Sequence, residues 1–109
     1  AIIEVKTSQS TRFVTGFYQK YKTPQQEHPT FWVLYSIIRL DDSFAERFFI
    51  LSHDELAEAQ AERNHPGEDL SYAERARRVV KGVDNVLVKN VEEHENAWHK
   101  IVKWCSDAA

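Results

Sequence analysis

The chain has 109 residues, of which 42% are hydrophobic and 12% are aromatic, and it carries a net charge of −3 at pH 7. This composition excludes intrinsic disorder and predicts one ordinary globular domain over residues 1–109. It lacks the strongly basic balance of a dedicated nucleic-acid-binding protein, so any such role must depend on local patches. No apolar run approaches the ~18 residues of a membrane span, and the first residues do not resemble a signal peptide. We therefore expect no membrane contacts. Because Cys105 is the only cysteine, we also expect no internal disulfide and a cytoplasmic location.

Residues 1–6 predict a β-strand that carries two charged side chains on one face. Side chains alternate along a strand, so Glu4 and Lys6 point one way, while Ile3 and Val5 point to the other side, where we expect an apolar layer. A carboxylate can ligate Mg²⁺, and an ammonium can stabilise charge on a phosphate. The pair therefore supplies half of a metal-dependent phosphodiesterase site. The alternative is a solvent-facing ion pair, worth well under about 1 kcal/mol.

Residues 11–22 predict a helix, because three aromatic residues recur at four-residue spacing. These residues are Phe13, Phe17 and Tyr21. We expect the stripe to pack into the core, which leaves Tyr18, Lys20 and Lys22 free to stack on bases and to contact phosphates.

The middle of the chain predicts a loop followed by an antiparallel strand pair. Residues 23–30 form the loop, since Pro24 and Pro29 restrict their neighbours to non-helical conformations. Residues 31–40 are almost continuously apolar, which is typical of a central strand covered on both faces. Residues 47–51 return as its antiparallel partner.

The second half predicts three helices, near 53–63, 71–81 and 91–106. Each follows a capping residue placed three positions before a glutamate, a spacing that satisfies the free backbone donors at a helix start. These pairs are Ser52 with Glu55, Ser71 with Glu74, and Asn90 with Glu93. Gly82 suits the end of the second helix, and residues 85–89 predict a short strand.

Together these elements predict an α/β (mixed α+β) fold in which one sheet of four strands is flanked by helices. The four strands are residues 1–6, 31–40, 47–51 and 85–89. We expect the broad apolar face of the last helix to dock on this sheet.

The run Ile3–Ser8, the strands that follow it and the final helical segment with Trp98 resemble the second half of a PD-(D/E)XK, restriction-endonuclease-like domain. The resemblance extends to about Ser52, and beyond that only to the general layout. It implies a mixed sheet flanked by helices and Mg²⁺-dependent hydrolysis of DNA. It also implies that Glu4 is a catalytic residue and metal ligand, and that Lys6 is the second catalytic residue.

The family's proline–aspartate element, on the strand before the Glu-x-Lys strand, has no counterpart in this chain. One carboxylate supplies too few ligands for Mg²⁺. We therefore expect a domain truncated at its N-terminus that is inactive or weak by itself, within a complete protein that is a nuclease. An acid from elsewhere, such as Asp41, Asp42 or Asp54, is an alternative source of the second carboxylate.

Other polar residues allow two interpretations. Ser8 and Gln9 can contact DNA, or they can make ordinary turn hydrogen bonds. A basic group late in the second helix fits a solvated face that complements the helix dipole better than it fits a phosphate site. It comprises Arg75, Arg77, Arg78 and Lys81. His94 and His99 lie about 140° apart around a helix, so they do not share a metal ion.

The alternative function is a non-catalytic binding or assembly domain that keeps the nuclease-like fold. Its partner would contact surfaces at Trp32, Trp98 and Trp104, or the region of Lys20 and Lys22. An exposed sheet edge at the first strand would also favour a homodimer.

Overall fold

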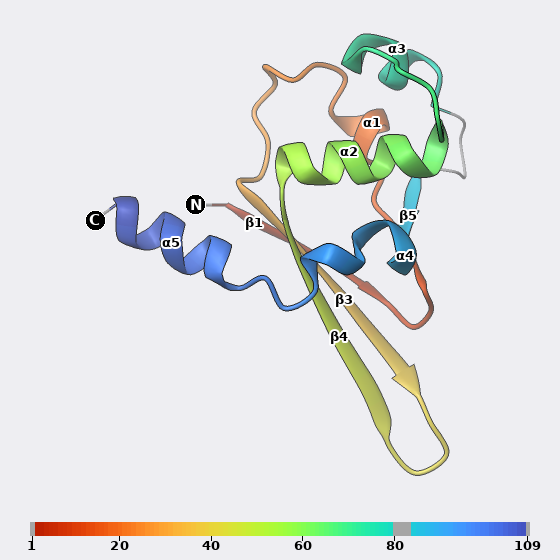
Figure 1. Ribbon diagram of the computed structural model, residues 1–109, viewed down its shortest axis with the longest axis vertical. Coiled ribbons are helices and arrows are strands. Elements are labelled where there is room, and N and C mark those ends of the chain that lie inside the picture. The colour runs from red at the N-terminus through yellow and green to blue at the C-terminus, as the bar shows by residue number, and fades with distance from the viewer. Residues whose placement is uncertain (1, 80–83, 109) are drawn as a thin grey trace.

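The computed structural model describes residues 2–79 and 84–108. Its main sheet has three strands in the order β1 (Ile3–Ser8), β3 (Phe31–Arg39) and β4 (Phe44–Ser52) (Figure 1). The central strand β3 pairs parallel with β1 and antiparallel with β4. The predicted mixed α+β fold and the central position of the 31–40 strand are thus confirmed.

The fourth predicted strand belongs to a second sheet. β5 (Asn85–Leu87) pairs antiparallel with β2 (Arg12–Val14), so its assignment to the main sheet is wrong. A buried glutamine explains this arrangement, because Gln60 Nε2 donates to Asn85 O at 2.7 Å and Gln60 Oε1 accepts from Thr15 Oγ1 at 2.6 Å. Both ends of its amide are thus satisfied where the two-stranded sheet meets the helix that carries Gln60.

The helix predicted over residues 11–22 is also wrong, because β2 and the short helix α1 (Phe17–Lys20) replace it. Gly16 separates them with a φ of 62°, a left-handed conformation that interrupts a helix. The Asp84 carboxylate then accepts hydrogen bonds from the backbone N–H groups of Tyr18 and Gln19. The three aromatic residues of the stripe are buried as expected, although they reach the core from different elements.

The helix-start signals predict two of the three helices. α2 (His53–Asn64) begins with both halves of a capping box, in which Ser52 Oγ accepts from Glu55 N at 3.1 Å and Glu55 Oε1 accepts from Ser52 N at 2.9 Å. α3 (Tyr72–Arg77) begins after Ser71, whose hydroxyl accepts from Glu74 N. It ends earlier than predicted, and Gly82 lies outside the described residues.

The continuous helix predicted over residues 91–106 is wrong. The segment folds as α4 (Val88–Val91), the 3-10 helix η1 (Glu92–His94) and α5 (His99–Ala108). Asn96 adopts a φ of 55°, and its N–H donates to Phe48 O at 2.8 Å, which exchanges a helical hydrogen bond for one to the sheet. Asn90 caps a different position, because its Oδ1 accepts from Leu87 N.

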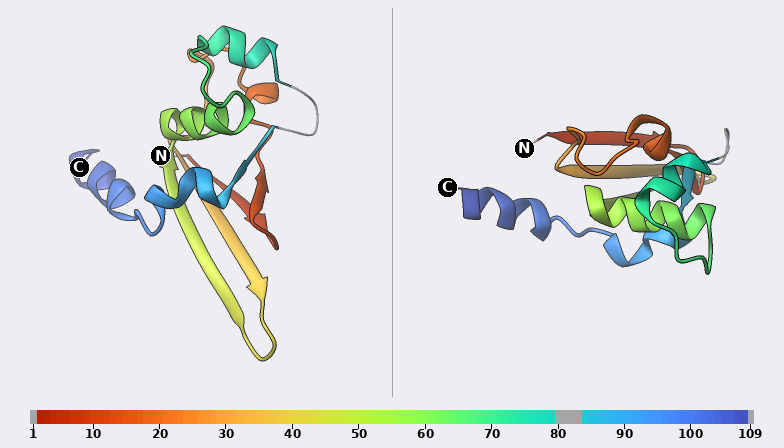
Figure 2. Two further views of the ribbon diagram at one scale, coloured as in Figure 1. Left: turned by 45° about the vertical axis from the view of Figure 1, so that its right-hand side comes forward. Right: turned by 90° about the horizontal axis from the view of Figure 1, so that it is seen from above.

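The main sheet has one well-covered face and one partly covered face. α2 lies along the first face (Figure 2), where it joins the larger core. Members of this core include Trp32, Leu34, Phe49, Leu51 and Leu56. The opposite face carries a smaller cluster, against which Ile101 of α5 packs. This cluster comprises Phe31, Val33, Ile50 and Ala97.

The apolar side chains of β1 are less buried than its charged side chains, contrary to the prediction. Ile3 and Val5 lie on the face of the smaller cluster but remain 43% and 57% exposed. Glu4 and Lys6 pair in register with Trp32 and Leu34, so they stand on the face of the larger core and are half-buried. The predicted apolar layer over Ile3 and Val5 is therefore wrong, because β1 lies at the sheet edge, beyond the elements that cover the centre.

No helix in residues 2–79 or 84–108 combines the length and the apolar character needed to cross a membrane.

Gly16 offers a test of this account of the chain between β2 and α1. A Cβ built on Gly16 meets no heavy atom within 4 Å, so Gly16→Ala is penalised only by its positive φ. We expect the free energy of unfolding to fall by about 1–2 kcal/mol in urea titrations. Gly16→Asn should lose less, because asparagine tolerates this conformation. Equal stability of Gly16→Ala and wild type would contradict the assigned backbone.

Candidate functional site

Glu4 and Lys6 form an ion pair at the edge of the main sheet. Lys6 Nζ lies 3.4 Å from Glu4 Oε1, and each side chain is 34% exposed. A pair this exposed contributes on the order of 1 kcal/mol or less to stability. The strand alternation predicted from the sequence is thus present, with both charges on one face and within reach of solvent.

Glu4 opens onto a hollow between β1 and the loop that precedes β3. The hollow has a volume of about 280 Å³ and is lined by side chains of opposite charge. Its polar lining residues are Glu4, Lys20, Gln26, Glu27 and His28. We call this the Glu4 hollow. It brings one predicted DNA-contacting residue, Lys20, to the same place as Glu4.

Gln26, Glu27 and His28 were not predicted as site residues. They lie in the proline-containing loop over residues 23–30, which no motif spacing connects to Glu4. The loop returns beside β1 because Thr30 N donates to Ile2 O at 2.8 Å, just before the parallel pairing of β3 begins.

Other predicted DNA-contacting residues lie elsewhere. Tyr18 is fully buried and its hydroxyl donates to Ala57 O at 2.9 Å, so the prediction that it is free is wrong. Its pKa is raised, chiefly by burial. Tyr18 is buried because α2 and α3 lie against this side of α1, where the Tyr72 ring is 5.1 Å from the Tyr18 ring. Lys22, by contrast, is exposed.

Ser8 and Gln9 lie at the far end of β1 from the Glu4 hollow. Ser8 Oγ donates to Arg12 O at 2.6 Å and accepts from Ser10 N at 3.0 Å, which is turn hydrogen bonding. Gln9 lines a separate hollow with Arg39. The contacts of Ser8 agree with the alternative, structural interpretation of that residue.

The alternative acids do not reach Glu4. Asp41 and Asp42 follow β3 at the tip of the β3–β4 hairpin, which projects away from the helices (Figure 1). Asp54, in the first turn of α2, does not line the Glu4 hollow. Within the described ranges, no three side chains of His, Cys, Asp or Glu are grouped so that they could hold a metal ion. Glu4 therefore stands at the predicted metal position with one further carboxylate, Glu27, in the same hollow.

Two stacked histidines form the inner support of the hollow. The rings of His28 and His53 are 3.7 Å apart between centroids and inclined by 8°. His53 is 4% exposed, and its Nδ1 accepts from Trp32 Nε1 at 3.2 Å. Burial, and then the neighbouring His28, lower the pKa of His53 to about 4. His53 is therefore a neutral ring at pH 7.

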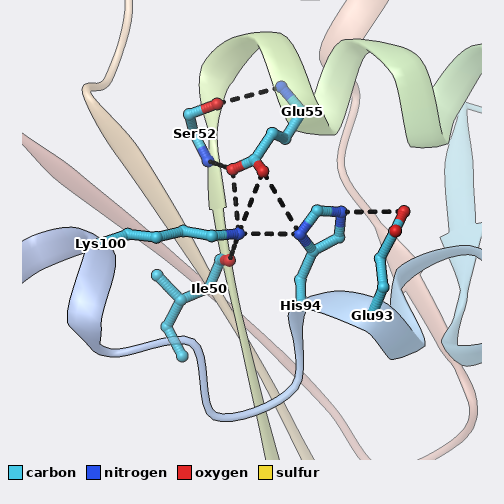
Figure 3. A network of polar contacts seen from close by, with 6 residues as sticks. All are labelled: Ile50, Ser52, Glu55, Glu93, His94 and Lys100. Carbon is cyan, nitrogen blue, oxygen red and sulfur yellow. Dashed lines mark hydrogen bonds and ion pairs between the residues drawn. The ribbon is translucent and has the colours of Figure 1, made fainter.

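A second polar network joins the C-terminal elements to α2 (Figure 3). Lys100 Nζ donates to Ile50 O at 2.9 Å, to Glu55 Oε2 at 3.1 Å and to His94 Nδ1 at 2.8 Å. Burial, together with the Lys100 charge, lowers the pKa of His94. The Glu55 pKa is also lowered, since hydrogen bonds from Ser52 N and Lys100 outweigh the effect of its burial. The network fixes α5 to the start of α2.

A further hollow adjoins this network and has a volume of about 480 Å³. Five glutamates line it, which makes it unsuitable for a phosphate group. They are Glu55, Glu58, Glu62, Glu68 and Glu93.

The basic group near α3 is paired with these and neighbouring acids. Arg75 lies 3.2 Å from Glu58, Arg78 lies 3.5 Å from Glu68, and Arg77 pairs with Glu74. Ion pairing favours the solvated-face interpretation for these arginines, and Lys81 lies outside the described residues.

The three tryptophans predicted to contact a partner differ in their exposure to solvent. Trp32 is 1% exposed, so its assignment to a contact surface is wrong, because it lies at the centre of the larger core. Trp98 and Trp104 are 42% and 39% exposed.

Comparison with protein-family models, curated proteins and solved structures found no match to this chain.

His53 predicts how stability depends on pH. Its pKa is about 4 in the folded protein and about 6.5 in the unfolded chain, so the unfolded chain binds more protons between these values. Above pH 6.5 the neutral His53 ring makes its full contribution to the free energy of unfolding. This contribution is lost as the pH falls from 6.5 through 4, and the free energy of unfolding then falls by roughly 3 kcal/mol. Urea titrations at pH 7 and pH 4 should show that the free energy of unfolding decreases less between these pH values in His53→Gln than in wild type. Equal losses would contradict the prediction. His94 acts in the same direction in both proteins.

Proposed function

We propose that this chain is part of a metal-dependent nuclease that hydrolyses phosphodiester bonds in DNA, with Glu4 and Lys6 at the reacting centre. The proposal depends on one observation, the carboxylate–ammonium pair on one face of an edge strand, with Glu4 open to a hollow. The resemblance of Ile3–Ser8 to PD-(D/E)XK domains supports the same chemistry, and the mixed sheet agrees with the layout that this resemblance implies.

Glu4 and Lys6 have separate roles in this proposal. Lys6 positions the attacking water and stabilises the negative charge that grows on the phosphate. Glu4 would hold Mg²⁺, which when bound supplies positive charge that polarises the phosphate oxygens. A carboxylate suits this hard cation, but Glu4 alone does not complete its shell. The proposal therefore includes a further carboxylate from outside the described residues, without which activity is absent or weak.

The proposed DNA-contacting surface lies next to the Glu4 hollow. Lys20 lines the hollow, and Lys22 is exposed two residues further along the chain. Two lysines beside the reacting centre would bind backbone phosphates without reading sequence. Ser8 and Gln9 are not part of this surface, because they lie at the opposite end of β1.

A cytoplasmic location is also proposed. Cys105 is the only cysteine of the chain and its thiol is free, as is usual for proteins of reducing compartments.

Cleavage of plasmid DNA by the longest natural form of the protein tests the catalytic proposal. We expect cleavage to require Mg²⁺ or Mn²⁺ and to fall by on the order of 10²-fold or more in Glu4→Gln and in Lys6→Met, because each variant removes one charge from the reacting centre. Initial rates with and without EDTA provide the measurement.

Matched controls separate chemistry from general charge effects. Glu62→Gln and Lys103→Met make the same chemical changes at exposed positions away from β1, and both should cleave at the wild-type rate. Cleavage that persists in Glu4→Gln and Lys6→Met would overturn the proposed function.

A second role, assembly of a homodimer, is favoured by the uncovered state of β1. The strand order places β1 at the edge of the main sheet, and Ile3 and Val5 are exposed there. An edge strand with exposed apolar side chains favours pairing with another chain. We propose that the partner is a second copy of the same strand.

Sedimentation velocity over a range of concentrations tests this assembly. Val5→Lys should weaken the dimer by at least about tenfold, which corresponds to about 1.4 kcal/mol, because charges on an edge strand oppose pairing. Val102→Lys is the control, since Val102 is similarly exposed but lies on α5. A wild-type protein that remains monomeric at every concentration would refute the dimer.

A further inference from the structure

The proposed hydrolysis needs a group that takes a proton from the attacking water, and Lys6 is not suited to this step. Its Nζ is ion-paired with Glu4 at 3.4 Å. A lysine in an ion pair is an ammonium, which has three N–H donors and no lone pair. A proton acceptor must therefore come from another residue beside Glu4.

His28 lines the Glu4 hollow and presents a nitrogen with a lone pair. Its Nδ1 lies 2.8 Å from Pro29 O. A carbonyl oxygen only accepts hydrogen bonds, so Nδ1 carries the proton and Nε2 of the neutral ring carries the lone pair. In the part of the chain that the structure describes, Nε2 has no hydrogen-bond partner. The hydrogen bond to Pro29 thus fixes the tautomer that a general base requires.

The orientation of His28 is fixed by a chain of contacts that begins beside Glu4. Trp32 pairs with Glu4 in the β1–β3 register, and its indole N–H holds His53 in place. His28 stacks in parallel on His53 at 3.7 Å. The buried His53 ring is neutral, so it supports His28 without placing a second positive charge against it. A base that is held by stacking and by one hydrogen bond has little freedom to turn away from the hollow.

We propose that His28 Nε2 accepts the proton of the water that attacks the phosphodiester at Glu4 and Lys6, an inference that rests on the proposed function. The water oxygen forms a bond to phosphorus as the bond from phosphorus to the leaving sugar oxygen breaks. The proton of the water passes to His28 Nε2, and the leaving oxygen takes a proton from solvent. Protonated His28 then returns its proton to solvent.

The groups that face His28 come from four elements. His53 stacks on it from α2, and Glu4 faces the hollow from β1. Lys20 borders the hollow at the end of α1, with Tyr21 directly after it, and Glu27 adjoins His28 in the loop. His28 itself combines a free lone pair on Nε2 with the fixed tautomer described above.

The test uses His28→Gln in the longest natural form of the protein, assayed on plasmid DNA. Glutamine keeps a polar side chain but does not accept a proton near neutral pH. We expect kcat to fall by on the order of 10²-fold or more with KM nearly unchanged, and the acidic limb of the pH–rate profile to disappear. His99→Gln is the control, because His99 is exposed on α5, and it should keep the wild-type rate and profile.

Nitrogen-15 NMR of the same protein gives a readout that does not depend on activity. We expect the neutral His28 ring to carry its proton on Nδ1, and a ring protonated on Nε2 would overturn the inference. Cleavage that needs Glu4 but proceeds at the wild-type rate in His28→Gln would overturn the inference and leave the proposed function standing. A wild-type protein that cleaves no DNA would overturn both.

Discussion

The parallel pairing of β1 with β3 is the constraint on which the rest of the structure depends. Parallel neighbours cannot be joined by a tight turn, so the chain must travel back to the start of the sheet before β3 begins. That return path contains β2, α1 and the loop over residues 23–30. It places the aromatic residues of α1 in the core, and it lays the loop beside Glu4. The hollow at this edge therefore depends on the crossover between β1 and β3 as well as on β1 itself.

The sequence predicts the fold best where one local signal acts alone. The apolar run over residues 31–40 becomes the central strand, and the pair Ser52 and Glu55 begins α2. Local signals fail where a distant group competes with them. A stripe of aromatic residues has helical spacing, but Gly16 and the distant carboxylate of Asp84 divide it between two elements. The last segment likewise has helical periodicity, and a hydrogen bond to Phe48 O interrupts it.

The candidate site follows the same rule. Glu4 and Lys6 were predictable because strand alternation alone places them on one face. The burial of Tyr18 was not predictable from local spacing, since it depends on contacts with α2 and α3. His28 had no signal in the sequence, because its neighbours Glu4 and His53 are brought to it only by the crossover and by α2. The sequence thus predicts the ion pair on one strand, but it does not predict the hollow that several elements assemble beside it.

The Lys100 ammonium has a consequence for which residues this position accepts. Its three acceptors, Ile50 O, Glu55 and His94 Nδ1, come from three elements and surround a single nitrogen (Figure 3). An ammonium directs its three N–H bonds outward from one point, whereas a guanidinium spreads its donors across a plane. Arginine at position 100 would keep the positive charge but could not direct three hydrogen bonds from one nitrogen. A substitution that keeps only the charge would therefore not preserve the attachment of α5. Here the geometry of the cation matters more than its sign.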